Sequence, residues 1–274
     1  MIKPLRLIVT LALSAAFLLA AGATGATAAD RPPRVYVTGD STAATYATSD
    51  APRAGWGQAL ELFLAKDVEV VNEAWSGASS KSFVEAGKLD AILRDIRPGD
   101  YLLVSFGHND QKTDERGTDP WSTYQDYLSL YIEGAREAGA IPVLVTSVER
   151  RRFDQSGEPQ QSLGDYPEAM RELGARTDTP VVDLHAMSLD HWGTLGIEGT
   201  KAEFLWLAPG EHANYPAGVQ DNTHFQERGA IELARLVVGA AKGQRVVSSD
   251  LTRRLGDEFP EGSLTWPATR PAED

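Results

Sequence analysis

The chain of 274 residues contains no cysteine. Disulfides are therefore excluded, and the fold has to be held together by its hydrophobic core. Thiol nucleophiles and thiolate metal sites are excluded for the same reason. With 42% hydrophobic residues the chain is too apolar for a disordered protein, and its length suits one domain of ordinary α/β size.

Basic residues are also scarce. The sequence has 26 lysines and arginines against 39 aspartates and glutamates, which gives a net charge of -13. Nucleic acids and anionic membrane surfaces are bound through basic patches, so this balance argues against both as partners. The acidity says little about a substrate, because in a secreted protein it is more often a matter of solubility.

Motifs for bound cofactors are missing as well. No glycine-rich phosphate loop occurs. Asp110, Asp114, Glu115 and Asp119 cluster loosely, but their spacing matches no calcium loop, and there is no His-x-x-x-His pair. We therefore expect neither a metal ion nor another cofactor.

The first 29 residues differ from the rest of the chain. Lys3 and Arg6 precede an apolar run over residues 7–21 that is short for a membrane span, and small residues follow up to Ala29. This pattern predicts a secretory signal peptide over residues 1–29, whose removal would take the net charge from -13 to -15. The mature protein is then expected to be extracellular or periplasmic, without membrane contact. An uncleaved N-terminal anchor is the alternative, and lipoprotein anchoring is excluded because no cysteine follows.

Short apolar strands alternate with helical patterns after residue 30. Strands are expected at residues 34–38, 68–71, 101–106, 141–145 and 181–184. Helical spacing follows Trp56 and recurs over residues 89–96, 124–138, 168–176 and 225–241, with Gly139 placed to cap one helix. Continuous apolar strands are typical of a parallel sheet covered on both faces. The sequence predicts a doubly wound, three-layer α/β/α sandwich of about five parallel strands over residues 30–247, with a C-terminal surface tail over residues 248–274.

Four short blocks carry polar residues. They are Gly39-Asp40-Ser41-Thr42, the lone Gly77 after Asn72, Gly107-His108-Asn109-Asp110, and Asp221-Asn222-Thr223-His224. The first three blocks each follow one of the first three predicted strands. Loops after the carboxyl ends of parallel strands form the ligand crevice of an open α/β sheet. We therefore expect the blocks to converge on one site.

Ser41 is the candidate nucleophile, although a Gly-Asp-Ser-Thr turn after a strand is also ordinary turn and cap chemistry. A hydroxyl needs an adjacent base to attack at neutral pH. Among the five histidines only His224 has a carboxylate three residues earlier in a turn just ahead of a helix. There Asp221 can hold the Nδ1–H group of His224 and leave Nε2 to face Ser41. The alternative is that Asp221 only caps the turn before the last helix.

The remaining histidines are assigned other roles. His185, His191 and His212 are expected to be surface or packing residues, as an isolated histidine usually is. His108 lies beside Asn109 and is expected to support its loop by hydrogen bonding rather than to act as a base.

Gly77 and Asn109 are candidates for stabilising the negative charge that forms during ester hydrolysis. Ester hydrolysis builds negative charge on the carbonyl oxygen, and hydrogen-bond donors must already point there. A glycine lets the backbone approach closely, and an asparagine side chain donates N–H groups. The backbone N–H groups of Ser41 and Gly77, with the side chain of Asn109, are therefore the predicted oxyanion hole. A simple turn or cap at Gly77 and Asn109 is the alternative.

In this order, the four blocks resemble those of the SGNH (GDSL) hydrolase superfamily. The resemblance implies the flavodoxin-like fold of that superfamily and a serine esterase. It also implies Ser41 as nucleophile, His224 as base, Asp221 as its orienter, and oxyanion donors from Ser41, Gly77 and Asn109.

A more specific resemblance is to the rhamnogalacturonan acetylesterases, a secreted branch of carbohydrate esterases. It covers roughly residues 34–241. The matching residues are Gly39-Asp40-Ser41-Thr42, Gly55-Trp56-Gly57-Gln58, Phe106-Gly107-His108-Asn109-Asp110, Thr146-Ser147, Arg151-Arg152-Phe153, Val182-Asp183-Leu184 and Asp221-Asn222-Thr223-His224-Phe225. The resemblance implies removal of O-acetyl groups from a plant cell-wall polysaccharide, most specifically the rhamnogalacturonan part of pectin, through an acetyl-enzyme.

The region around residues 193–216 matches that family less well. Its aromatic residues Trp192, Trp206 and Tyr215 are candidates for shaping the substrate rim, but core packing is the favoured role for at least half of the aromatic side chains. No substrate-binding residue is assigned, and a monomer is expected. The alternatives in function are a lipase, thioesterase, arylesterase or acetylxylan esterase on the same fold, and a polysaccharide-binding protein without activity.

Overall fold

The computed structural model describes residues 31–271, so the predicted signal peptide lies outside the described residues. A five-stranded sheet forms the centre, with all neighbouring strands parallel and in the order β3-β1-β4-β5-β6. The strands are β1 (Val35–Gly39), β3 (Val70–Asn72), β4 (Tyr101–Ser105), β5 (Ile141–Val145) and β6 (Val181–Val182). By place in the sequence this order is 2-1-3-4-5, the flavodoxin-like doubly wound arrangement. The predicted fold class is confirmed.

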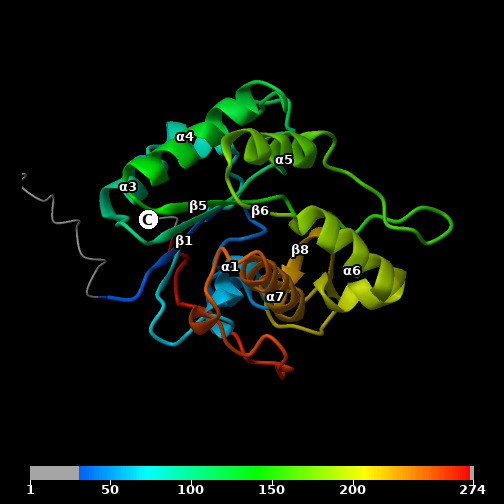
Figure 1. Cartoon of the computed structure of the whole chain (residues 1–274). Helices are drawn as coiled ribbons and strands as arrows, with labels where there is room; N and C mark the ends of the chain where they lie inside the picture. Colours follow the sequence, from blue (N-terminus) through cyan, green and yellow to red (C-terminus); the bar gives the residue numbers. More distant parts are fainter. Residues whose placement is uncertain (1–30, 272–274) are drawn as a thin grey trace, which may run out of the picture.

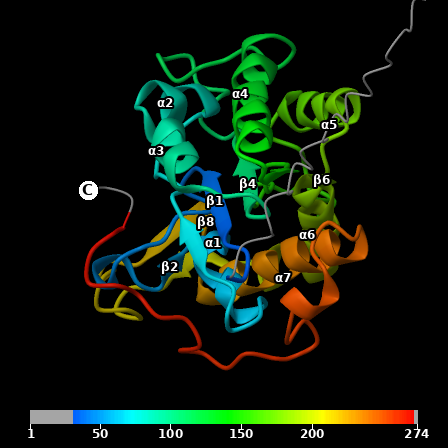
Figure 2. The same ribbon diagram turned by 60° about the vertical axis from the view of Figure 1, so that its left-hand side comes forward.

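Helices cover both faces of this sheet (Figures 1 and 2). On one face lie α2 (Ser80–Glu85), α3 (Lys88–Asp95), α4 (Thr123–Glu137) and α5 (Tyr166–Thr177). On the other lie α1 (Trp56–Ala59), α6 (Leu184–Gly199) and α7 (Glu227–Gly243). Gly139 follows α4 with a φ of +75°, in the left-handed conformation that a glycine cap adopts.

Each face of the sheet has its own apolar core. Phe83, Phe106 and Tyr131 pack together on the α4 side, and Trp56 and Leu233 belong to the core on the α7 side. All five residues of β1 and of β4 are buried, which explains why these strands are mostly apolar. Each fully buried large apolar side chain contributes about 1.5–3 kcal/mol, and a core of this kind can stabilise a chain that has no disulfide.

A second, antiparallel sheet was not predicted. Its order is β2-β8-β7, formed by β2 (Arg53–Ala54), β7 (Phe204–Leu207) and β8 (Val219–Gln226). Asp221 to His224 lie just ahead of helix α7, as predicted, but the structure assigns them to strand β8 and not to a separate turn. Their polar sequence shows no strand alternation, and β8 is paired with segments remote in sequence.

The region around residues 193–216 also differs from the expectation. Helix α6 runs into it from Leu184, and a short 3-10 turn follows at Thr200–Ala202. Elsewhere in the described residues, 3-10 turns occur at Thr48–Asp50, Leu60–Leu62 and Ser249–Leu251. Trp192 is completely buried, with its ring 4.9 Å from that of Phe204. Trp192 therefore has the core-packing role and is not part of a substrate rim, because its indole lies in the core between α6 and the small sheet.

The C-terminal tail packs along the domain as far as it is described (Figure 2). The N–H group of Arg253 donates to the carbonyl of Phe63 at 2.8 Å. Further on, the N–H of Leu264 donates to the Glu227 carboxylate at 2.7 Å, and the Arg270 guanidinium pairs with Asp50 at 2.5 Å. Within residues 31–271, the helices fall short of the length and apolarity that crossing a membrane requires.

Candidate active site

The turn after β1 presents Ser41. The Asp40 carboxylate accepts hydrogen bonds from the backbone N–H and the hydroxyl of Thr42, each at 2.8 Å. Asp40 therefore supplies the turn chemistry that was the alternative role for this block, and the Ser41 hydroxyl is directed elsewhere. Gly39 has to be glycine because a Cβ atom there would lie 2.8 Å from the carbonyl oxygen of Ser105.

The Ser41 hydroxyl meets the imidazole of His224. Ser41 Oγ lies 2.9 Å from His224 Nε2, and His224 Nδ1 lies 2.6 Å from Asp221 Oδ2. An ionised carboxylate only accepts hydrogen bonds, so Nδ1 carries the imidazole proton and Nε2 accepts from the serine. Serine, imidazole and carboxylate therefore form one continuous hydrogen-bonded series.

Asp221 contacts both the imidazole of His224 and the backbone of its own segment. Its Oδ2 atom holds the imidazole, while Oδ1 accepts from the backbone N–H groups of Thr223 at 2.7 Å and His224 at 3.0 Å. Burial alone would raise the pKa of Asp221, but the hydrogen bonds from His224 and from the two N–H groups outweigh it and bring the pKa down to about 2. The carboxylate is therefore ionised at any ordinary pH.

Two of the three predicted oxyanion donors, Gly77 and Asn109, lie on adjoining loops. Gly77 has a φ of +84°, and a Cβ atom there would approach only Arg116, at 3.8 Å, so backbone conformation rather than crowding favours glycine. Asn109 is buried and its amide donates to the carbonyl of Ala78 at 2.9 Å, which ties its loop to the one that holds Gly77. An amide nitrogen has a second hydrogen, which is the donor that an oxyanion would need.

A tyrosine joins the Ser41 turn to the Gly77 loop. The Tyr46 hydroxyl donates to the carbonyl of Ser41 at 2.7 Å and lies 3.3 Å from the hydroxyl of Ser76, which directly precedes Gly77. Tyr46 is completely buried, and burial raises its pKa to about 12. It thus remains a neutral donor. No local sequence pattern marks Tyr46 as a residue of the site.

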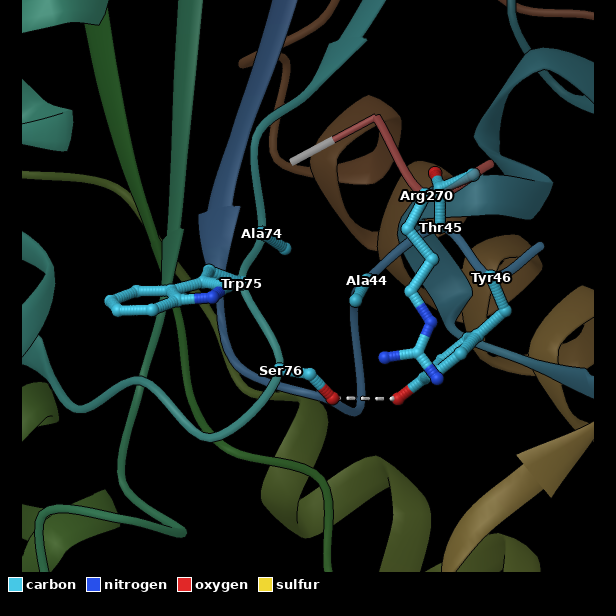
Figure 3. Close-up of a pocket in the computed structure, with 7 residues that line it drawn as sticks. All are labelled: Ala44, Thr45, Tyr46, Ala74, Trp75, Ser76 and Arg270. Atoms are coloured by element: carbon cyan, nitrogen blue, oxygen red, sulfur yellow. Dashed lines mark hydrogen bonds between the residues drawn. The ribbon is translucent and has the colours of Figure 1, made fainter. Parts of the chain in front are cut away.

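A small pocket has this tyrosine in its lining. It is lined by Ala44, Thr45, Tyr46, Ala74, Trp75, Ser76 and Arg270 (Figure 3). The Tyr46–Ser76 contact lies at one end of it, and the tail contributes Arg270. The C-terminal tail, which the sequence analysis left without a role, thus reaches the neighbourhood of the nucleophile turn.

His108 and Asp110 support the loop after β4. His108 is buried and its Nε2–H donates to the carbonyl of Val148 at 2.9 Å, as expected for a supporting residue. Burial lowers the pKa of His108, which favours the neutral imidazole. The completely buried Asp110 accepts from the hydroxyl of Ser80 at 2.5 Å, and burial raises the pKa of Asp110 to about 7. The burial of Asp110 was not predicted from the sequence.

The other histidines have partners away from Ser41. His185 contacts Glu149 at 3.2 Å, and His191 contacts Glu203 at 2.9 Å. His212 accepts from the N–H of Asn214 at 3.1 Å. Within residues 31–271, no three histidine, aspartate or glutamate side chains are grouped so that they could hold a metal ion.

Of the remaining residues predicted for the rim, Tyr215 donates its hydroxyl to the carbonyl of Asp50 at 3.0 Å. Trp206 lies beside the catalytic candidates, since its Nε1–H donates to Asn222 Oδ1 at 3.0 Å. Its ring has the guanidinium of Arg151 at 4.5 Å and the ammonium of Lys201 at 5.1 Å. Cationic side chains therefore pack against the indole of Trp206.

A serine–histidine–aspartate series at the carboxyl end of a doubly wound sheet is the arrangement of an ester hydrolase. The sequence model of the GDSL-like Lipase/Acylhydrolase family matches residues 37–230, and the chain belongs to this family. The predicted membership of the SGNH (GDSL) hydrolases and the prediction of a carboxylic ester hydrolase are confirmed.

Two curated relatives come from Bacillus subtilis. The rhamnogalacturonan acetylesterase RhgT is 50% identical over 207 residues, which are 76% of this chain and 88% of the relative. The probable rhamnogalacturonan acetylesterase YesY is 40% identical over 81% of this chain and 96% of the relative. The resemblance to rhamnogalacturonan acetylesterases inferred from the sequence is thereby confirmed.

Solved structures agree on the fold. The crystal structure of YxiM from Bacillus subtilis matches with a TM-score of 0.68 and 28% identity, over 79% of this chain and 58% of that longer chain. The acetylxylan esterase Axe2 from Geobacillus stearothermophilus matches with a TM-score of 0.54 and 16% identity, over 77% of this chain and 94% of that one. The second likeness concerns the fold alone.

Proposed function

We propose that this protein is a secreted carbohydrate acetylesterase that removes O-acetyl groups from acetylated rhamnogalacturonan in pectin. The observation that carries the proposal is the hydrogen-bonded series from Ser41 through His224 to Asp221. The likeness to RhgT and YesY, which extends over most of both chains, supports the substrate class.

The first half of the reaction acylates Ser41. His224 Nε2 takes the proton of the Ser41 hydroxyl while Oγ forms a bond to the acetyl carbonyl carbon. Negative charge develops on the carbonyl oxygen, where the N–H groups of Ser41, Gly77 and the Asn109 amide stabilise it. The intermediate then collapses, the bond to the sugar oxygen breaks, and that oxygen leaves with the proton from His224.

The second half releases acetate. A water molecule gives a proton to His224 Nε2 and attacks the acetyl carbonyl, and Ser41 Oγ recovers the proton as acetate departs. The Asp221 carboxylate keeps its negative charge throughout and stabilises the imidazolium that forms in both halves. This role needs an ionised carboxylate, and the pKa of about 2 for Asp221 supplies one.

The location of apolar space in the protein favours a short acyl group over a lipase substrate. A small apolar space is lined by Val35, Leu103, Val237 and other core residues between the sheet and α7, and it shares no residue with the proposed site. The pocket beside the nucleophile turn is small, and its lining mixes apolar side chains such as Ala44 and Trp75 with the polar Ser76. An acetyl group needs no large apolar pocket.

The test is acetate release from acetylated rhamnogalacturonan, acetylated xylan and a long-chain ester, with wild type and Ser41→Ala compared. The proposal expects release from the pectin fraction that Ser41→Ala abolishes. The exposed Ser156, at the tip of the 153–160 hairpin, provides the matched control, and Ser156→Ala should retain full activity. A preference for xylan would assign a different polysaccharide as the substrate, and a preference for the long-chain ester would favour a lipase. Wild-type activity in Ser41→Ala would refute the assignment of Ser41 as the nucleophile.

Secretion is proposed from the predicted signal peptide over residues 1–29. Protein recovered from the medium or periplasm of an expressing bacterium should begin after Ala28 or Ala29 on N-terminal sequencing. Membrane-bound protein that still carries residues 1–29 would favour the uncleaved anchor.

A further inference from the structure

The segment that carries Asp221 and His224 falls in a break of the β7–β8 ladder. Phe204 pairs with Phe225, but Trp206 already pairs with Gln220. One residue of β7 thus faces the four residues 221–224 of β8, which form a bulge (the β8 bulge below). On the other side of β8, strand β2 pairs only with Phe225 and Gln226.

The β8 bulge is therefore held by bonds other than strand pairing. Within the bulge, Asp221 Oδ1 accepts hydrogen bonds from the backbone N–H groups of Thr223 and His224. These internal bonds shape the bulge but do not connect it to the rest of the protein. Its external attachment has to come from other residues.

Arg151 provides this attachment at Asn222, the residue that follows Asp221. The backbone N–H of Arg151 donates to the carbonyl of Asn222 at 2.8 Å. The Arg151 guanidinium donates to Asn222 Oδ1 at 3.2 Å, and the indole N–H of Trp206 donates to the same oxygen at 3.0 Å. Three hydrogen bonds thus converge on Asn222.

Arg151 is itself held rigidly. It is 9% exposed, its Nε donates to the hydroxyl of Thr200 at 2.9 Å, and Nη2 donates to the carbonyl of Ile197 at 2.6 Å. Its guanidinium also lies over the ring of Trp206 at 4.5 Å. All of its hydrogen-bond acceptors are uncharged, so the arrangement uses the fork of donors on the guanidinium rather than an ion pair.

We propose that Arg151 is a positioning residue, which holds the β8 bulge so that His224 meets Ser41. The inference rests on the proposed function, because it assumes that His224 acts as the base. A reacting group misplaced by about 1 Å can lose about 100-fold in rate even when the cause lies away from the chemistry. Loss of the Arg151 guanidinium bonds, with the backbone bond to Asn222 retained, should therefore act on turnover through His224.

The test compares Arg151→Met, Arg151→Lys and Trp206→Phe on two substrates, an acetylated polysaccharide and the small ester 4-nitrophenyl acetate. Arg151→Met should lower kcat about 30- to 100-fold on both substrates, with KM within about threefold. Arg151→Lys should recover little, because a lysine keeps the charge but lacks the fork. Trp206→Phe keeps the ring, removes one neutral hydrogen bond, and should lower kcat about three- to tenfold.

Proton NMR of the His224–Asp221 contact reports directly on the geometry of the site. The His224 Nδ1 proton, which lies in the 2.6 Å contact with Asp221, should give a downfield proton NMR signal that broadens or is lost in Arg151→Met. The control is Arg171→Met, because Arg171 pairs with Glu168 and Asp183 outside the site, and its kcat should stay within twofold of wild type. If Arg151→Met fails to fold, Arg151→Lys and Trp206→Phe decide the question.

Two results would overturn the inference. One is a kcat within twofold of wild type in the folded variants on both substrates, even with a lowered Tm. The other is a loss confined to the polysaccharide, which would assign Arg151 to substrate contact. Both differ from failure of the proposed function, which would appear as wild-type activity in Ser41→Ala.

Discussion

Ser41 Oγ and His224 Nε2 lie 2.9 Å apart, although 183 positions separate the two residues in the sequence. One sits on the turn after the first strand of the parallel sheet, and the other on a bulge of the small antiparallel sheet. The proposed site therefore depends on how two sheets are packed against each other. Its chemistry leads to the predictions that follow.

Asp221→Asn should preserve the site but reverse the imidazole tautomer. The asparagine oxygen can replace Oδ1 as the acceptor for Thr223 and His224, but its amide then faces His224 Nδ1 and drives the imidazole proton to Nε2. We expect kcat to fall by about 10³- to 10⁴-fold, with Tm changed by only a few degrees. Steady-state kinetics and thermal unfolding check this, and a kcat within tenfold of wild type would contradict the role of Asp221.

Gly77→Ala should impair catalysis through the backbone. Alanine in the left-handed region costs about 1–2 kcal/mol, and relaxation of the φ of +84° would turn the proposed donor N–H away. Loss of one oxyanion donor typically costs about 100- to 1000-fold in kcat, so a fall of at least about 100-fold is expected.

Gly87 offers the matched control for this variant. It also has a positive φ, of +71°, and a Cβ atom there would have nothing within 4 Å. Gly87→Ala should therefore lose a similar amount of stability in urea unfolding while kcat stays at the wild-type level. If Gly77→Ala also changed stability alone, Gly77 would be a simple turn residue.

Asp110 should make stability depend on pH between about 4 and 7. Its pKa in the folded protein is raised to about 7 by burial, so the folded state keeps a proton that the unfolded state releases near pH 4. The stability from Asp110 is full below the unfolded pKa and is lost as pH rises to 7, by about 3–4 kcal/mol. Urea unfolding from pH 4 to 7.5 should show wild type losing this amount relative to Asp110→Asn. Parallel curves for the two proteins would rule out the raised pKa.

Glu227 should anchor the tail to α7. It is buried, and its carboxylate accepts from the N–H groups of Gly262 at 2.9 Å and Leu264 at 2.7 Å. Glu227→Ala should lower the free energy of unfolding by about 2–3 kcal/mol, because both N–H groups lose a charged acceptor. Glu232→Ala, which removes a partly exposed pair with Arg235 on the same helix, should change it by less than about 1 kcal/mol. Equal effects of the two substitutions would mean that the tail contacts add nothing.

The parallel sheet could be predicted well because its signals are local. The strand predicted at residues 141–145 has those bounds in the structure, and the other four differ by up to two residues at an end. β6 ends at Val182, earlier than predicted, because Asp183 caps the following helix by accepting from the N–H of Ala186. A buried parallel strand is apolar along its whole length, and that pattern is visible in a single sequence.

Helix α6 was missed for an equally local reason. It contains Gly193, Gly196 and Gly199, which are poor helix formers, and Gly196 has a φ of +68° inside it. Its propensity and pattern are therefore weak. The helix forms because packing of its apolar side chains, Trp192 in particular, outweighs the local preference.

The sequence by itself determined which reactive side chains this protein has and which class of sheet presents them. The absence of cysteine, the strand–helix alternation and the polar residues at the strand ends already pointed to a serine ester hydrolase on a parallel sheet. These features depend on residue type and on neighbours within a few positions, so they can be seen without coordinates.

Only the tertiary structure decided how these groups meet. It placed Asp221 and His224 in a bulge of β8, attached that bulge through Arg151, and brought the tail to the pocket beside Tyr46. Each of these contacts joins residues far apart in the chain. Their geometry follows from the packing of whole helices and sheets, which no local pattern of residues specifies.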